Sequence, residues 1–311
     1  QILTENLKGL EIDRRAAQLA RFALLVKAAQ YDRRALDRDD LRPEVYAMPG
    51  PRDFSTSDLR AYLGDDVFDA HGAEIKDALD LIAEHGQNVG SALKMDFSDE
   101  GREAIMSRVA HWDSREEGEL DIGQQDLVPA LRAYLKPLLL LTGDYPAVAM
   151  NPPYMSNRKM NEDLKGYIKE KYQRSKTDLY STFMEVGKRV AKTEGRLGLI
   201  NQQSWMFLSS YEGLRTHLIE NTLIESMLHL GPHTFDEISG EVVQSTTFVL
   251  HNSVPGGRTG TYYRLVDESE SKSKLKAFQR RDNQHAGVDQ QRFAKIPGAP
   301  IAYWVPQAVI N

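Results

Sequence analysis

The sequence has no cysteine in its 311 residues. Disulfide bonds and thiolate metal ligands are therefore excluded, and the composition fits a reducing compartment, so the cytoplasm is the expected location. Long apolar runs are also missing, because no stretch approaches the roughly 20 residues that a membrane-spanning helix needs. We expect a globular chain, large enough to bury a full core, with no membrane partner.

Positive charge is in short supply as well. The 39 Lys and Arg residues are outnumbered by 45 Asp and Glu residues, which gives a formal net charge of −6. That sign is wrong for a surface that grips phosphate everywhere, so any contact with nucleic acid must be local. A solvated helix face or such a local contact explains the one basic run, which follows residues 151–154. The run consists of Arg158, Lys159, Lys165, Lys169, Lys171, Arg174 and Lys176.

Hydrophobic periodicity predicts strands and helices in alternation. The first half holds a strand at 7–13, a helix at 14–30, a strand at 43–48 and a charge-rich helical stretch at 55–136. The second half holds a buried-type strand at 145–150, helices at 178–192 and 209–221, and strands at 196–201, 223–230, 241–251 and 261–266. We expect the last two strands to pair with each other. The alternation predicts an α/β fold with a mostly parallel sheet covered on both faces.

Residues 151–154, Asn-Pro-Pro-Tyr, follow the predicted strand at 145–150. Ligands of open α/β sheets bind at the carboxyl ends of strands. The 6-amino group of adenine is a poor nucleophile, because its lone pair is delocalised into the ring. The amide oxygen of Asn151 and the carbonyl of Pro152 are two acceptors that favour a more tetrahedral nitrogen. Pro152 and Pro153 keep this corner rigid, and Tyr154 can stack on a base.

Each of these signals has a plainer alternative. Asn and Pro are common in turns, so four residues alone do not separate a turn from a site. The preceding strand and the surrounding alternation favour the site. Glu11 ends the first strand, where nucleotide-binding α/β folds carry an acidic residue for the ribose hydroxyls. A helix start is the alternative there, and it suits Asp13 better than Glu11. The eight histidines are scattered, and we predict no metal site.

Several strings in one order resemble the gamma-class adenine-N6 DNA methyltransferases, and within them the PglX enzymes of BREX phage-exclusion systems. They lie at 10–13, 151–155, 175–180, 203–210, 240–244 and 296–304. The resemblance implies a Rossmann-like methyltransferase sheet with a helical insertion. It also implies S-adenosyl-L-methionine as cofactor, double-stranded DNA and other phage-defence proteins as partners, and a target adenine flipped out of the duplex.

The same resemblance implies further site residues. Phe235 would stack on the face of the flipped base opposite Tyr154, although a core or surface aromatic is an equal alternative. Asp178, Leu179 and Phe183 would lie near the cofactor or shape its pocket. A plain helix start explains Asp178 equally well.

One departure from the family pattern concerns the cofactor. The family's first motif is a glycine-containing loop that should precede Glu11, and the sequence does not contain it. The helical stretch also hides the third motif. We therefore expect an N-terminally truncated chain that binds the cofactor weakly or not at all and is inactive by itself. The expected domains are an incomplete cofactor half at 1–54, an insertion at 55–140, a catalytic half at 141–267, and a linker with the start of a target-recognition domain at 268–311.

Two other functions stay open. Asn-Pro-Pro-Tyr corners also serve methyltransferases that act on RNA bases or on glutamine side chains of proteins, because the planar NH2 group poses the same problem. A catalytically silent scaffold that contacts DNA or defence-system partners is the second alternative. Loss of methylation on mutation of Asn151 separates an enzyme from a scaffold.

Overall fold

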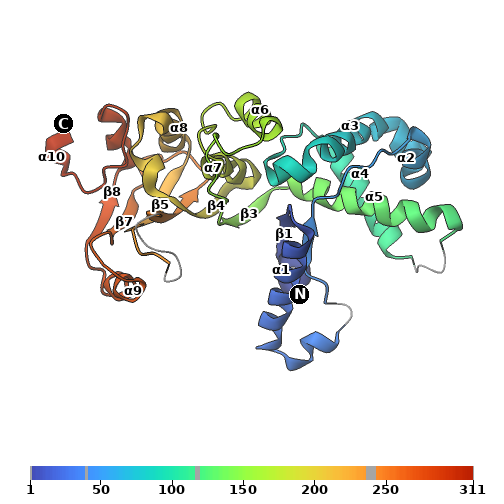
Figure 1. The fold of residues 1–311 in the computed structure, drawn as a ribbon, viewed down its shortest axis with the longest axis horizontal. Helices are drawn as coiled ribbons and strands as arrows, with labels where there is room; N and C mark the ends of the chain where they lie inside the picture. The colour runs from blue at the N-terminus through green and yellow to red at the C-terminus, as the bar shows by residue number, and fades with distance from the viewer. Residues whose placement is uncertain (1, 39–40, 116–119, 236–242, 311) are drawn as a thin grey trace. The chain divides into compact units, whose positions relative to one another are not determined.

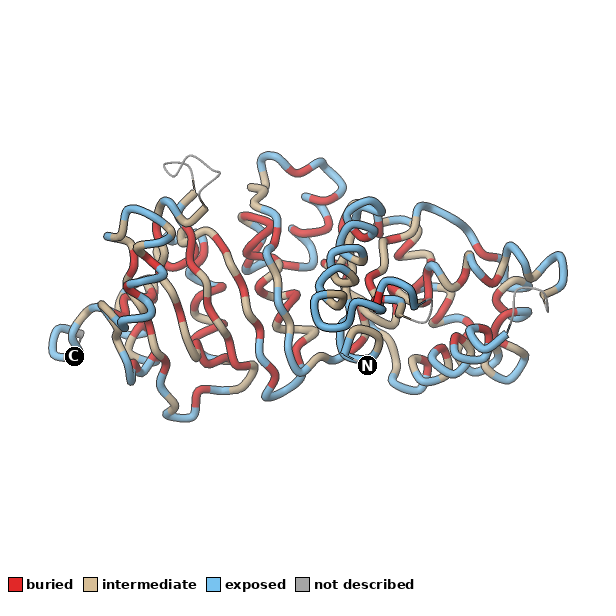
Figure 2. Tube along the Cα trace, turned by 90° about the horizontal axis from the view of Figure 1, so that it is seen from below, coloured by how far each residue is buried: buried red, intermediate tan, exposed pale blue. Residues whose placement is uncertain are grey.

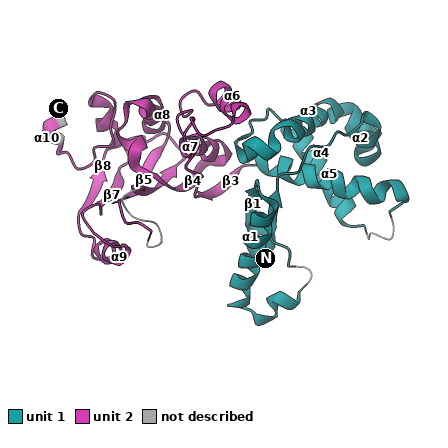
Figure 3. Ribbon diagram, in the orientation of Figure 1, with its two compact units in different colours: residues 1–143 teal, residues 144–311 magenta. Residues whose placement is uncertain are grey.

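The computed structural model divides into two compact units, residues 1–143 and 144–311 (Figure 3). It describes residues 2–38, 41–115, 120–235 and 243–310, and the structural statements below concern these residues. No helix within these ranges has the length and apolar character needed to cross a bilayer.

The first unit joins a two-stranded parallel sheet to a group of helices (Figure 1). Its elements are η1 (Ile2–Asn6), β1 (Lys8–Glu11), α1 (Arg14–Ala29), η2 (Arg33–Asp37), β2 (Glu44–Ala47), α2 (Thr56–Leu63), α3 (Asp65–Val89), η3 (Gly90–Ala92), α4 (Asp99–Asp113) and α5 (Ile122–Leu141). The predicted strand-helix-strand start and the helical stretch are therefore confirmed. The helices α2 to α5 bury apolar side chains at helical spacing, such as Ile75 and Ile82 in α3 and Leu131 in α5.

The second unit is built on a six-stranded sheet in the order β3-β4-β6-β5-β7-β8. Its elements are β3 (Tyr145–Met150), α6 (Glu162–Lys171), α7 (Leu179–Val190), β4 (Ala191–Gln202), η5 (Gln203–Met206), η6 (Ser209–Tyr211), α8 (Glu212–Asn221), β5 (Leu223–Gly231), β6 (Ser245–His251), β7 (Gly260–Arg264), α9 (Ser271–Arg280), β8 (Gln284–Val288), η7 (Gln290–Lys295) and α10 (Gln307–Ile310). The α/β class predicted from the sequence is confirmed.

Three expectations about this sheet are wrong. The sheet is mixed, because only β3–β4 and β5–β7 pair in parallel, while β4–β6, β5–β6 and β7–β8 are antiparallel. The strands β6 and β7 do not form a hairpin. Both edges of β6 are occupied by β4 and β5, so no edge is left for β7. The strand β3 is an edge strand with Pro146, Ala147 and Ala149 exposed, not a buried one.

One face of the sheet carries the core of this unit, and buried positions run along its strands in Figure 2. Residues that pair across neighbouring strands point to the same face. The ladder register aligns an apolar row across five strands, and helices α7 and α8 pack against this face. The row consists of Met150, Leu199, Phe248, Met227 and Tyr262.

The segment at 268–311 also packs onto this sheet. The segment expected to be a linker or surface helix holds α9 and the edge strand β8. Ile301 and Tyr303, expected to begin a further domain, belong to the core, and Tyr303 stacks on Tyr262 at 5.0 Å between ring centroids. The buried Arg215 side chain donates to the carbonyls of Gly298 and Ala299 and so fixes this segment to α8.

Candidate active site

The Asn-Pro-Pro-Tyr corner begins directly after β3, at the carboxyl edge of the parallel β3–β4 pair. The side chain of Asn151 is exposed and forms no hydrogen bond with any residue that the structure describes. Pro152 is buried and Pro153 is exposed. The corner therefore presents an uncommitted amide at the sheet edge where α/β folds bind ligands.

Tyr154 is held against the sheet by both ends of its side chain. Its hydroxyl donates to the carbonyl of Ile200 on β4 (3.3 Å), and its ring meets that of Tyr180 edge-on at 5.9 Å. Burial raises the pKa of Tyr154, so the phenol stays protonated and remains a donor at neutral pH. The side chain is only half-buried, which leaves part of the ring accessible for stacking.

Asp178 ties the exit of the corner to the start of α7. Its Oδ1 accepts hydrogen bonds from the backbone N–H of Met155 (3.1 Å) and of Tyr180 (3.2 Å), and the Leu179 N–H donates to the Met155 carbonyl (2.9 Å). Burial raises the pKa of Asp178, and these backbone donors oppose that effect. The observed contacts are those of a helix cap that also positions the corner. Proximity to a cofactor, predicted for Asp178, Leu179 and Phe183, stays a prediction. Leu179 is buried and Phe183 half-buried.

Glu11 lies in the first unit, at the carboxyl end of β1. Its Oε1 accepts from the N–H groups of Ile12 (2.9 Å) and Asp13 (3.3 Å). Asp13 caps α1, because its carboxylate accepts from Arg15 N (2.6 Å) and Ala16 N (3.0 Å). The helix-start interpretation is therefore confirmed for Asp13. The ribose-binding role of Glu11 stays a prediction.

Phe235 is half-buried and follows the end of β5. Its ring contacts no other aromatic ring in the part of the chain that the structure describes, so its pairing with Tyr154 across a base stays a prediction. Most of the string at 240–244 lies outside the described residues.

The basic run after the corner is partly neutralised within α6. Lys165 lies 3.4 Å from Glu162, and Lys171 lies 2.8 Å from Glu170. Acidic residues therefore alternate with basic ones on this helix, and a uniformly positive surface does not form there.

Sequence reasoning missed a second group of residues at the same sheet edge. A pocket of about 450 Å³ is lined by Gln203, Phe207, His229, Arg264 and Trp304, among others. His229 had been one of several scattered histidines, and Arg264 carried no signal. Gln203 and Trp304 did fall within the strings that resemble the methyltransferases. Their place in these strings is the one sequence signal for the two residues, and it does not indicate that they lie close together in the fold.

Comparisons with known proteins identify related sequences. A family model described as Eco57I restriction-modification methylase matches residues 5–235. The "Adenine-specific methyltransferase BrxX" of Escherichia coli O9:H4 (strain HS) is 36% identical over 328 residues, covering 100% of this chain and 27% of that protein. The "Adenine-specific methyltransferase PglX" of Lacticaseibacillus casei (strain Zhang) is 36% identical, covering 97% of this chain and 25% of that protein.

The chain thus spans about a quarter of the length of these curated relatives. Among solved structures, a DrdV–DNA complex matches 90% of this chain and 23% of its own, with 14% identity and a TM-score of 0.47.

Proposed function

This chain belongs to the Eco57I family of restriction-modification methylases, and from that premise we propose that it forms the catalytic part of a DNA adenine-N6 methyltransferase. The observation that carries the proposal is the corner at residues 151–154. It combines a free amide, a rigid backbone and an accessible aromatic ring at the carboxyl edge of a parallel strand pair.

The chemistry follows from the acceptors of the corner. The amide oxygen of Asn151 and the carbonyl of Pro152 accept hydrogen bonds from the amino group of the target adenine and favour a pyramidal nitrogen. Tyr154 stacks on the base, with its phenol fixed to Ile200 so that the ring stays in place. Asp178 holds the exit of the corner and acts as a positioning residue. Phe235 is proposed to contact the opposite face of the base.

S-adenosyl-L-methionine is the cofactor that this family implies, and it supplies an activated methyl group on a sulfonium. The residues present fit part of that cofactor. Glu11 lies at the carboxyl end of a parallel strand, and of its two carboxylate oxygens only Oε1 accepts hydrogen bonds from described residues. Its other oxygen can accept a hydrogen bond from a ribose hydroxyl. We propose Glu11 for that role, with Leu179 and Phe183 shaping the cofactor pocket.

The substrate is proposed to be double-stranded DNA with the adenine flipped out, since an amino group inside the stack is unreachable. Restriction-modification and phage defence are the settings that the family description and the names of the two relatives suggest. Selection of the DNA sequence is proposed to depend on a separate target-recognition domain.

The test is transfer of radiolabelled methyl groups from S-adenosylmethionine to DNA by the native protein. Asn151→Ala removes the acceptor oxygen and is expected to lower the rate about 10²–10³-fold. Asn151→Asp keeps an acceptor and is expected to lose less. Asn221→Ala makes the same change at the end of α8, where His217 is the one described residue that the side chain bonds, and is the matched control. Equal rates for Asn151→Ala and Asn221→Ala contradict the proposal, and label in RNA or protein but not DNA redirects it.

A further inference from the structure

A polar row lies directly above the apolar row of the second unit. Moving two residues along each strand from Leu199, Phe248, Met227 and Tyr262 keeps the same face and reaches the next level of the ladder. The residues at that level are Asn201, Thr246, His229 and Arg264. Four polar side chains therefore stand side by side across β4, β6, β5 and β7, where the core meets the carboxyl edge of the sheet.

This row does not pair up within itself. Thr246 donates to the carbonyl of Leu228 (3.1 Å). Asn201 is fully buried, and neither its amide oxygen nor its amide nitrogen has a hydrogen-bond partner among the described residues. A buried polar group without a partner typically costs about 1–3 kcal/mol of stability. An apolar residue at this position would avoid that cost, so fold stability alone does not explain the row.

His229 orders the polar groups around it. Its Nε2 lies 2.7 Å from Gln203 Oε1, and its Nδ1 lies 3.0 Å from the Tyr303 hydroxyl. Because an amide oxygen only accepts, Nε2 carries the proton and Nδ1 accepts from Tyr303. Burial lowers the pKa of His229 to about 4, so the ring is neutral at physiological pH. The Gln203 amide then donates onward to the Gln244 side chain, whose own NH2 group has no hydrogen-bond partner among the described residues.

Donors and aromatic faces meet at the rim of the pocket. The Trp304 side chain is 38% exposed and stacks by one face on His229, at 6.3 Å between centroids, and Phe207 packs edge-on against it. The Arg264 guanidinium lies 5.9 Å from the centre of the Trp304 ring. Among the described residues, the acid nearest to Arg264 is Asp267, at 3.7 Å, and 70% of that side chain is exposed to water. The positive charge is therefore weakly paired.

We propose that this pocket is a second nucleotide subsite, which binds one unpaired nucleotide of the DNA strand beside the Asn-Pro-Pro-Tyr corner. The base stacks on the exposed part of Trp304, the amides of Gln203 and Gln244 donate to acceptor atoms on its edge, and Arg264 binds its phosphate. This inference rests on the proposed function, because it takes DNA as the substrate.

Size and position support this choice of ligand. The cavity of about 450 Å³ falls within the range of small-ligand sites. It opens at the sheet edge that carries the corner, and Ile200, which binds Tyr154, is the chain neighbour of Asn201 in the polar row. Among the described residues, the rim offers amide and guanidinium donors, so a ligand with acceptors and negative charge fits them.

The experiment measures binding of the 311-residue chain to a thymidylate hexamer and to a hexamer of the same backbone without bases. Anisotropy of an end label reports affinity, and tryptophan fluorescence reports the pocket, since Trp304 is exposed while Trp112 and Trp205 are buried. We expect the hexamer with bases to quench the fluorescence and to bind about tenfold more tightly than the abasic one.

Variants attribute the binding to the pocket. Trp304→Ala and Arg264→Ala are each expected to weaken hexamer binding about tenfold, and Trp304→Phe less, because it keeps a stacking ring. Arg196→Ala is the matched control, since Arg196 forms a similar exposed ion pair, with Glu225, at the opposite sheet edge. A melting temperature close to that of the native chain shows that a variant is folded. If Trp304→Ala does not fold, Trp304→Phe replaces it in the binding test.

The outcomes separate this proposal from the proposed function. Equal binding of both hexamers assigns the pocket to phosphate alone and overturns the nucleotide subsite, and so does unchanged binding by the Trp304 and Arg264 variants. Asn151→Ala is expected to bind the hexamer normally. If the pocket binds the hexamer but the native protein transfers no methyl group, the nucleotide subsite stands and the methyltransferase assignment fails.

Discussion

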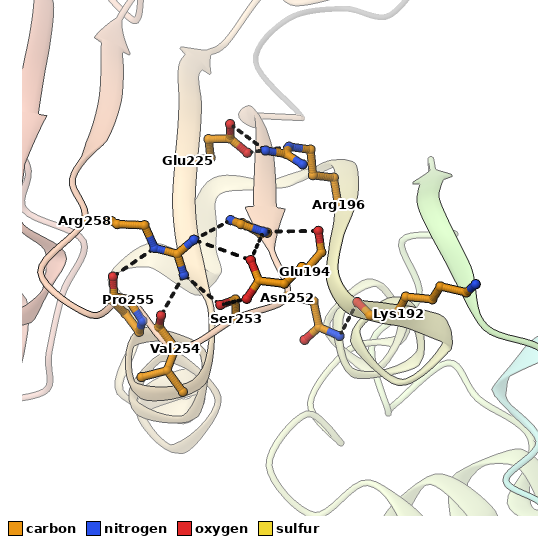
Figure 4. Close-up of polar contacts among 10 residues, drawn as sticks. Lys192, Glu194, Arg196, Glu225, Asn252, Ser253, Val254, Pro255 and Arg258 are labelled. Atoms are coloured by element: carbon orange, nitrogen blue, oxygen red, sulfur yellow. Dashed lines mark hydrogen bonds and ion pairs between the residues drawn. The ribbon is translucent and has the colours of Figure 1, made fainter.

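Polar side chains are paired differently at the two edges of the six-stranded sheet that the strand ends form. At the edge where β4 begins and β6 ends, polar groups satisfy one another (Figure 4). Arg258 donates to Ser253 Oγ (2.7 Å) and to the Val254 carbonyl (2.8 Å), and the Asn252 amide donates to three backbone carbonyls.

At the carboxyl edge, by contrast, polar groups remain unused. Asn151 is exposed without a partner, and Asn201 is buried without one, in both cases among the described residues. Among the described residues, Arg264 pairs with one acid, the largely exposed Asp267 at 3.7 Å. Polar groups that bind each other stabilise a fold, whereas an exposed amide without a partner among the described residues, such as that of Asn151, is available to a ligand. This difference supports the proposal that the carboxyl edge binds the ligand, while the polar groups of the opposite edge stabilise the fold.

The largest effect on stability is expected at the edge where β4 begins and β6 ends. Asn252→Ala removes the donor to the carbonyls of Lys188, Ala191 and Lys192 and should lower the free energy of unfolding by about 2–3 kcal/mol. Urea unfolding of the 311-residue chain measures this change in the free energy of unfolding. At a temperature where the Asn252→Ala variant is folded, its rate of methyl transfer should be unaltered. Lost methyl transfer in a folded variant would remove the distinction between the edges.

A pH effect follows from His229. Burial, with the charges of Arg264 and Lys274, holds its pKa at about 4 in the folded chain, below the unfolded value of 6.5. The unfolded chain therefore takes up the proton first, and stability falls as the pH drops from about 7 towards 4. Between pH 7.5 and pH 5 the contribution is about 2 kcal/mol. Urea unfolding at both pH values should show that His229→Gln loses less stability between pH 7.5 and pH 5 than the native chain does. Equal losses would refute the role of His229 in this pH dependence.

A smaller effect is expected at the corner. Tyr154→Ala removes the stacking ring and should slow methyl transfer about tenfold, or about 1.4 kcal/mol. Tyr154→Phe removes only the hydroxyl that bonds Ile200 and should slow it less. Methyl-transfer rates of the native protein with saturating cofactor measure both changes. If Phe is as damaging as Ala, the hydroxyl matters more than the ring, and the stacking role fails.

The smallest effect is expected for Arg196→Ala. The ion pair with Glu225 is exposed, with 52% and 40% of the two side chains accessible, and such pairs contribute about 0–1 kcal/mol. Unfolding in low and high salt should differ little between this variant and the native chain. If the free energy of unfolding fell by several kcal/mol, the edge where β4 begins and β6 ends would depend on its surface charges rather than on hydrogen bonds to the backbone.

The corner was predictable because its information is local. Residues 151–154 are contiguous, prolines restrict the backbone, and the strand before them is visible in the sequence. The cap at Asp13 is local in the same way, since a carboxylate there needs only the next helical turn.

The pocket and the sheet order were not predictable for the converse reason. Gln203, His229, Arg264 and Trp304 come from four separate segments, and only the register of the strands brings them together. Residues 255–257, Pro-Gly-Gly, favour a turn and so a hairpin, but they carry no information on which strand lies between β6 and β7. β8 was missed because Gln284–Val288 has no alternation of apolar and polar residues.

The central claim is that Asn151 serves methyl transfer to adenine in DNA. Single-molecule sequencing of DNA from cells that carry the native protein, the Asn151→Ala variant or the Asn221→Ala control tests it most directly. The account predicts N6-methyladenine at one short sequence motif with the native protein and the control, and none with Asn151→Ala. Methylation that persists in Asn151→Ala, or that is missing with the native protein, would contradict it.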